Sequence, residues 1–149
     1  MRAVIQRVAD ASVTIEGKVK ACIGAGYMVL LGVELTDAKE DAEWLASKIA
    51  QLRVMNDENG KMNLDIKQTS GEVLVISQFT LHAAYKKGNR PSFIKAARPE
   101  VATPLYEYFC EQLSVLLGKK VETGVFGADM KVSLTNDGPV TIVMDTKEE

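Results

Sequence analysis

Small polar side chains follow the apolar run 73–76 in the middle of the chain. They are Ser77, Gln78 and Thr80, interrupted by Phe79 and followed by Leu81. If the apolar run is a buried strand, backbone N–H groups released from pairing at its end could polarise an ester carbonyl. A strand that simply runs into solvent would have the same pattern, so both interpretations stay open.

Conventional catalytic groups are missing from the sequence. His82 is the single histidine, and no G-x-S-x-G segment places a serine beside it, which argues against a Ser-His-Asp hydrolase. His82 is therefore either a catalytic base or a surface or packing residue. No His, Cys or carboxylate grouping has the spacing of metal ligands, so we expect no metal and no cofactor. Gly24-Ala25-Gly26 precedes a strand pattern, not a helix, and predicts a turn or bulge instead of a phosphate-binding loop.

A turn signature lies near the end of the chain at Asn136-Asp137-Gly138-Pro139. Apolar residues alternate over 130–135 and again over 140–144, so the pattern predicts a hairpin turn between two strands. Gly138-Pro139 is also stiff, lacks a β-carbon at its first residue and can adopt the cis form.

Positive charge is concentrated between residues 86 and 98, although the whole chain has a formal charge of -2 and a pI of about 5.5. This stretch has five basic residues and no Asp or Glu: Lys86, Lys87, Arg90, Lys95 and Arg98. It is either a solvated loop or a local contact for nucleic acid.

Strands are predicted on either side of a helical segment. Alternation over 4–19 predicts strands joined by a hairpin turn at 16–18, and the run 27–33 predicts a strand buried on both faces in the centre of a sheet. The segment 72–81 predicts a second buried strand. Side chains alternate along a strand, so Gln78 and Thr80 would face one side and Ser77 and Phe79 the other.

Two amphipathic helices should cover the sheet. Asp37 with Glu40 gives an N-terminal capping signature before apolar residues at helical spacing up to Leu52, with Trp44 on the wetter side. The second helix begins between Pro99 and Pro104 and ends at Gly118. Its expected apolar stripe is Leu105, Tyr108, Phe109, Leu113, Leu116 and Leu117.

Length and composition predict one domain over residues 1–149, since 46% of residues are hydrophobic and 26% are charged. No apolar run approaches the roughly 20 residues of a membrane span, so we expect a soluble, cytoplasmic protein without membrane contact. Cys22 and Cys110 are too few for a disulfide framework, and both are expected as small core residues. The tail Lys147-Glu148-Glu149 is expected to be frayed.

Seven segments resemble, in order, blocks of the D-aminoacyl-tRNA deacylase family of the bacterial and eukaryotic type. They are Gln6-Arg7-Val8, Leu30-Leu31-Gly32-Val33, Gly60-Lys61-Met62-Asn63, Ser77-Gln78-Phe79-Thr80-Leu81, Arg90-Pro91-Ser92-Phe93, Phe126-Gly127-Ala128-Asp129-Met130 and Asn136-Asp137-Gly138-Pro139-Val140-Thr141. The resemblance spans nearly the whole chain. It implies an α/β (α+β) fold with an antiparallel, partly barrel-like sheet covered by two main helices, and a homodimer with its sites at the interface.

The resemblance also implies an activity and its residues. The family hydrolyses D-aminoacyl-tRNA, and also glycyl-tRNA, with help from the terminal ribose 2′-hydroxyl. By this resemblance a cis Gly138-Pro139 peptide would form a backbone wall that excludes L side chains in the partner's site. Backbone groups of Ser77, Gln78 and Phe79 would bind the substrate carbonyl and terminal adenosine. Thr80 is considered a nucleophile in the family, but nothing in this sequence activates its hydroxyl, which favours a positioning role.

Further residues receive supporting roles from the same resemblance. Arg7 would brace the Gly138-Pro139 loop, with Met130, Asn136 and Thr141 as supporting residues. The basic residues Lys86, Lys87 and Arg90 become candidate contacts for tRNA phosphates. Two other functions remain as alternatives: an esterase of small D-amino acid derivatives and a non-catalytic dimeric RNA-binding module.

Overall fold

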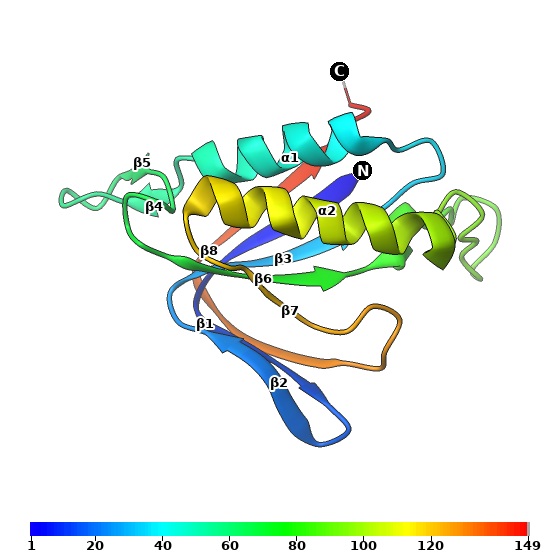
Figure 1. The fold of residues 1–149 in the computed structure, drawn as a ribbon, viewed down its shortest axis with the longest axis horizontal. Helices are drawn as coiled ribbons and strands as arrows, with labels where there is room; N and C mark the ends of the chain where they lie inside the picture. Colours follow the sequence, from blue (N-terminus) through cyan, green and yellow to red (C-terminus); the bar gives the residue numbers. More distant parts are fainter. Residues whose placement is uncertain (149) are drawn as a thin grey trace.

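The computed structural model describes residues 1–148, which form a six-stranded sheet with two helices lying across one face (Figure 1). The strands of this sheet follow the order β2-β1-β3-β6-β7, and β8 pairs with the other side of β1. Their bounds are β1 Arg2–Ile15, β2 Lys18–Ile23, β3 Gly26–Gly32, β6 Glu72–Ser77, β7 Glu122–Thr123 and β8 Lys131–Asp145. The helices are α1 Lys39–Gln51 and α2 Pro99–Leu117, with a short 3-10 helix η1 at Phe79–His82.

The long strand β1 makes the sheet curl. Its first half, residues 2–8, pairs with β3, whereas its second half, residues 11–15, pairs with β2. Strand β8 follows β1 along both halves, so the lower part of the sheet folds away from the helices (Figure 1). The predicted partly barrel-like α/β sheet with two helices is confirmed. The pairs β3–β6 and β6–β7 are parallel, so the sheet is mixed and not wholly antiparallel.

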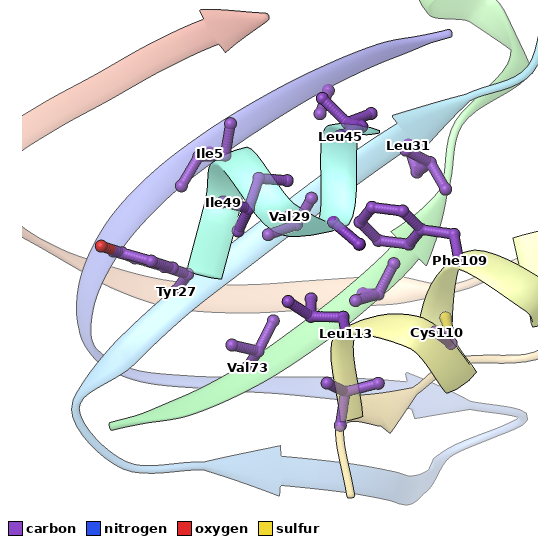
Figure 2. Packing of buried hydrophobic residues seen from close by; sticks show 14 of the residues in the cluster. Ile5, Tyr27, Val29, Leu31, Leu45, Ile49, Val73, Phe109, Cys110 and Leu113 are labelled. Carbon is purple, nitrogen blue, oxygen red and sulfur yellow. The ribbon is translucent and has the colours of Figure 1, made fainter. Parts of the chain in front are cut away.

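Strand β3 lies at the centre of the sheet, as its continuous apolar sequence predicts. Alternate side chains enter two apolar clusters, one under the helices and one inside the curled half of the sheet. Tyr27, Val29 and Leu31 face the helices and pack with Ile49 of α1 and Phe109 of α2 (Figure 2). Met28 faces the other cluster. Strand β3 thus supplies side chains to both apolar clusters.

Helix α1 begins one residue later than its sequence signature suggests. Ala38 is the N-cap residue, and its N–H donates to the Asp41 carboxylate at 2.9 Å. The expected cap, Asp37, instead accepts from the N–H of Glu34 at 2.7 Å and from the Met1 ammonium group at 2.7 Å. The capping prediction at Asp37 is therefore wrong, because a buried ion pair holds this carboxylate away from the helix end.

Helix α2 begins with Pro99 in its first turn and ends where Gly118 takes the left-handed conformation, with φ 70°, as predicted. Its buried face differs from the expected stripe. Tyr106 is buried in place of Tyr108, and Leu116 is exposed. None of the helices within residues 1–148 is both long and apolar enough to cross a membrane.

A small hairpin, β4 Met55–Asn56 with β5 Met62–Leu64, stands at one end of the sheet. The Lys147 ammonium lies 3.1 Å from the Asp41 carboxylate, so the prediction of a frayed tail is wrong at Lys147. Glu149 lies outside the described residues. Cys110 is buried as expected, whereas Cys22 is exposed on β2, and the core prediction is wrong for Cys22.

Candidate active site

The polar segment after β6 turns into a 3-10 helix and does not continue as a strand. Strand β6 ends at Ser77, the N–H of Gln78 donates to the carbonyl of Leu31 at 2.8 Å, and η1 follows. The predicted alternation of residues 77–80 across a strand is therefore wrong. The amide of Gln78 instead donates to the Thr80 hydroxyl at 2.5 Å.

The glycine at the end of β3 makes this turn possible. A Cβ at Gly32 would lie 3.0 Å from the Gln78 carbonyl oxygen and 3.1 Å from the side chains of Leu81 and His82. Such contacts are too close for a well-packed side chain. A glycine at the end of β3 thus lets η1 fold directly against the sheet, and this residue was a signal for the turn in the sequence.

Two backbone donors at the start of η1 are unpaired within the described residues. Within residues 1–148, neither the N–H of Phe79 nor that of Thr80 donates to a protein acceptor. The first residues of a 3-10 helix have no intrahelical acceptor for these groups. The Phe79 ring is 55% exposed and meets the Phe93 ring edge to face, with centroids 5.1 Å apart. The segment thus has two unpaired backbone donors beside an aromatic surface.

A cavity of about 300 Å³ opens next to this segment. Ser77, Gln78 and Phe79 form one rim, and further lining comes from α2, the 126–130 loop and residues of the sheet such as Leu31 and Val132. The apolar and aromatic part of the wall includes Ala102, Tyr106, Phe126 and Met130. The Tyr106 hydroxyl donates to the carbonyl of Val75 at 2.8 Å, and burial raises the pKa of this phenol. Its proton is thus engaged within the structure. Asp129 is the other titratable side chain in the cavity lining; it is exposed on the 126–130 loop, with its carboxylate 3.2 Å from the Lys131 ammonium group.

The structure gives this cavity residues that sequence reasoning did not place there. Ala102 and Tyr106 lie on α2, where helical spacing marked only core positions. The segment 126–130 contributed to the family resemblance, yet only Met130 received a role. His82 does not line this cavity. It is the last residue of η1 and is 3% exposed, so the structure favours the packing interpretation over a catalytic base.

The Gly138-Pro139 segment lies in the middle of β8 and not in a hairpin turn. Strand β8 is continuous, so the prediction of two strands around a turn is wrong. Val8 pairs with Asn136 and Gln6 pairs with Thr141, which leaves residues 137–140 bulging opposite the single residue Arg7. The peptide bond is cis, and both residues are exposed.

Arg7 of β1 holds this bulge through hydrogen bonds. Its side chain is 6% exposed, and its Nε donates to the carbonyl of Asp137 at 2.9 Å. One Nη donates to the carbonyl of Val54 at 2.7 Å and to the Asn56 side chain at 3.1 Å. The Asp137 carboxylate lies 3.6 Å from Nε. A planar guanidinium can serve all these acceptors at once, so the bulge is tied to β1 and to the β4–β5 hairpin.

Two other predicted supporting residues lie near the bulge. The Thr141 hydroxyl donates to the Gln6 side chain at 2.5 Å, and Asn136 is exposed in β8. The third, Met130, lies at the first cavity. Lys86, Lys87 and Arg90 are exposed on the loop after η1, where they line a second cavity.

The bulge and the first cavity lie at opposite ends of the sheet in one chain. Arg7 pairs with Tyr27, while Ser77 pairs with Leu31 on the same strand β3. The two rows are four residues apart along β3, which corresponds to about 13 Å. One copy of the chain therefore cannot bring Gly138-Pro139 to the donors of η1.

Comparisons with known proteins show the family of this chain. A family model described as D-Tyr-tRNA(Tyr) deacylase matches residues 4–145. The chain belongs to this deacylase family.

Curated relatives of the deacylase family match along their full length. The D-aminoacyl-tRNA deacylases of Bacteroides thetaiotaomicron and Phocaeicola vulgatus are 62% and 63% identical to this chain, covering 100% of it and 99% of each relative. That of Akkermansia muciniphila is 57% identical over 99% of both chains.

Solved structures are also similar. One named c-Myc DNA Unwinding Element Binding Protein has a TM-score of 0.92 and 41% identity, covering 99% of this chain and 100% of its own. Another, described as a probable eukaryotic D-amino acid tRNA deacylase, has a TM-score of 0.81 at 16% identity over 96% of this chain and 97% of its own, which shows a shared fold.

Proposed function

We propose that this chain hydrolyses the ester bond of D-aminoacyl-tRNA and leaves L-aminoacyl-tRNA intact. The observation that carries the proposal is the family match over residues 4–145. Relatives about 60% identical over the whole length are named for this reaction. The unpaired donors of Phe79 and Thr80 beside a mostly apolar cavity suit the carbonyl and terminal adenosine of such a substrate.

The site is completed by a second copy of the chain. The distance of about 13 Å between the Arg7 and Ser77 rows supports this, because Gly138-Pro139 can meet η1 only from a neighbouring molecule. Strand β8 also has an unpaired edge within the described residues, with Val143 exposed on it. A long open edge with apolar side chains is normally covered in a soluble protein. We assign the covering partner as an identical chain.

Selection against L-residues follows from a rigid backbone wall at Gly138-Pro139. D- and L-residues differ by exchanging hydrogen and side chain at one carbon. A fixed surface against that carbon therefore rejects the L side chain without reading its identity. Arg7 supplies the rigidity through its bonds to Asp137 and Val54. Glycine has no side chain to exclude, so glycyl-tRNA is also a substrate.

Hydrolysis in this scheme needs no protein base. Water adds to the ester carbonyl, the N–H groups of Phe79 and Thr80 stabilise the developing oxyanion, and the bond to the ribose oxygen then breaks. The proton passes to the leaving oxygen with help from the neighbouring ribose 2′-hydroxyl. The Thr80 hydroxyl, which accepts from Gln78, acts in positioning.

Enantiomer pairs test the proposal directly. Purified protein should deacylate D-Tyr-tRNA and glycyl-tRNA and spare L-Tyr-tRNA. Removing the terminal 2′-hydroxyl of the tRNA should abolish turnover, whereas an esterase of small D-amino acid derivatives would be indifferent to that change. Equal turnover of both enantiomers would refute the assignment.

Mixed dimers test the shared site. Gly138→Trp, whose side chain would fill the partner's site, and Phe79→Pro, which lacks one oxyanion donor, should each be nearly inactive alone. After mixing and exchange, half of the dimers are hybrids that contain one intact site, so about a quarter of wild-type activity should return. No recovery despite measured subunit exchange would show that the site does not cross the interface.

The basic loop supplies contacts to the RNA backbone. The three residues Lys86, Lys87 and Arg90 are exposed beside η1. Replacing all three with Ala should raise KM for D-Tyr-tRNA and flatten its salt dependence by about three charges. An unchanged KM and salt slope would place the phosphate contacts elsewhere.

Nucleic-acid binding without hydrolysis is a second candidate function. It is favoured by the 41% identical structure, whose name describes binding to a DNA element. Side-by-side measurements of binding to that class of DNA and of D-aminoacyl-tRNA hydrolysis separate the two. Binding without any release of amino acid would support this second function.

A further inference from the structure

A second cavity lies on the other side of η1, outside the candidate active site. Its volume is about 720 Å³. Five basic side chains and no carboxylate line it: Arg2, Lys86, Lys87, Arg90 and Lys95. Such a lining in a chain of net charge -2 creates a local attraction for anions.

Exposed apolar side chains line the same cavity. Tyr85 is 70% exposed and Ile94 is 78% exposed. Ala84 and Ser92 exchange backbone hydrogen bonds of 2.7 and 2.8 Å, which close the loop between them. The backbone position of Tyr85, the next residue after Ala84, is therefore fixed. An aromatic surface among Lys and Arg residues is the combination that binds single-stranded nucleic acid, because bases stack while phosphates pair.

Two further polar residues, His82 and Arg2, lie in the cavity wall. His82 is almost fully buried, and its Nε2 has no partner within residues 1–148. This nitrogen is shielded from solvent, so the ligand contacts in this cavity come from its exposed side chains. Arg2 is fixed by donating to the Asp145 carboxylate and to the carbonyl of Leu81, both at 2.8 Å.

The two cavities share η1 as a wall. Gln78 and Phe79 line the first, while His82 and Ala83 line the second. A 3-10 helix rises about 2 Å per residue, so the four residues of η1 separate the cavities by roughly 8 Å. That separation is comparable to one repeat of a nucleotide chain.

We propose that the second cavity binds the unpaired nucleotide that precedes the terminal adenosine of the tRNA. This inference rests on the proposed deacylase function, in which the first cavity holds the adenosine. The base lies against Tyr85 and Ile94, and the phosphate between the two nucleosides meets the basic side chains. The basic loop is thus a nucleotide subsite as well as a general phosphate contact.

Short substrates test the subsite without the rest of the tRNA. The pair is D-tyrosyl-adenosine and D-tyrosyl-cytidylyl-adenosine, both esterified at the terminal ribose. Stacking of one base predicts that kcat/KM rises about tenfold from the first substrate to the second. Tyr85→Ala should remove that rise and leave the adenosine ester unchanged, whereas Tyr85→Phe, which keeps the ring, should retain it.

Controls separate this proposal from the function on which it rests. Trp44→Ala removes an exposed aromatic from α1 and should leave the ratio of the two substrates unchanged. If wild-type protein hydrolyses neither ester nor D-Tyr-tRNA, the proposed function fails. If it hydrolyses both esters equally well, or if Tyr85→Ala slows both by the same factor, the nucleotide subsite is wrong while the deacylase function stands.

Discussion

Replacing Gly138 with Ala perturbs the proposed wall by one methyl group. Gly138 has φ +126°, and residues held in such sparsely populated regions lose about 1–3 kcal/mol of stability. The new Cβ would lie 3.0 Å from Arg7 Nη2 and 3.1 Å from the backbone nitrogen of Val140. Arg7 cannot retreat freely, because its bonds to Asp137 and Val54 hold it.

These contributions give a total destabilisation of about 3 kcal/mol, and for a chain of this size Tm should fall by about 6–12 °C. The bulge must also shift by a few tenths of an ångström. Displacements of this order affect alignment at a reacting centre strongly. We therefore expect the ratio of kcat/KM for D-Tyr-tRNA over L-Tyr-tRNA to fall at least about tenfold, or about 1.4 kcal/mol in differential barrier.

Gly118→Ala is the matched control. Gly118 also has positive φ, at +70°, but no atom lies within 4 Å of the point where a Cβ would stand, and it ends α2 away from the bulge. It should lose about 1–2 kcal/mol of stability with no change in enantiomer ratio. Both variants are assayed below their Tm with purified D- and L-Tyr-tRNA. A folded Gly138→Ala protein with the wild-type ratio would refute the wall and the role given to Arg7.

Three further changes test other features. Phe79→Pro removes an N–H at the first position of η1, where proline is tolerated, so single-turnover hydrolysis of D-Tyr-tRNA should be about 100-fold slower than in Phe79→Ala, which keeps that donor; equal rates would contradict the oxyanion role. Asp37→Ala leaves the buried Met1 ammonium group without its carboxylate and should lower the unfolding free energy in urea by about 3–5 kcal/mol; a loss near zero would contradict the buried pair. Burial raises the pKa of the Cys110 thiol to about 12, so a thiol reagent at about pH 8 should modify Cys22 and spare Cys110 until the protein is unfolded. Mass spectrometry reads the labelled positions, and rapid labelling of Cys110 in the native protein would contradict this prediction.

The spacing of apolar residues predicted the helices and the central strand, because each of these elements buries a face whose residues recur at a regular spacing. The run 27–33 became β3, and the stretch from Pro99 to Gly118 became α2. Tyr106 lies within the regular helical row of buried residues Ala102, Tyr106, Phe109, Leu113 and Leu117, so the expected stripe with Tyr108 was placed too far around the helix. The hydroxyl of Tyr106 reaches the carbonyl of Val75, which only the packed sheet places there.

The site was harder to predict because it depends on departures from regular strands. Residues 77–81 have a strand-like sequence, but Gly32 on a neighbouring strand admits the turn that replaces it. The sequence 136–139 has turn chemistry, yet pairing with β1 on both sides makes it a bulge. Both outcomes are decided by residues distant in sequence. The resemblance to a family identified these segments, whereas periodicity alone misassigned them.

The anchoring of β8 determines how the proposed wall at Gly138-Pro139 would lose its function on heating. Loop-borne sites often open locally before the rest of a protein unfolds. The bulge at Gly138-Pro139 has paired ladder on both sides, so it can move only when the sheet itself gives way. Selectivity and fold would then be lost together. A heat-damaged molecule would lose all activity. It would not become a nonselective hydrolase that deacylates correct L-aminoacyl-tRNA in the cell.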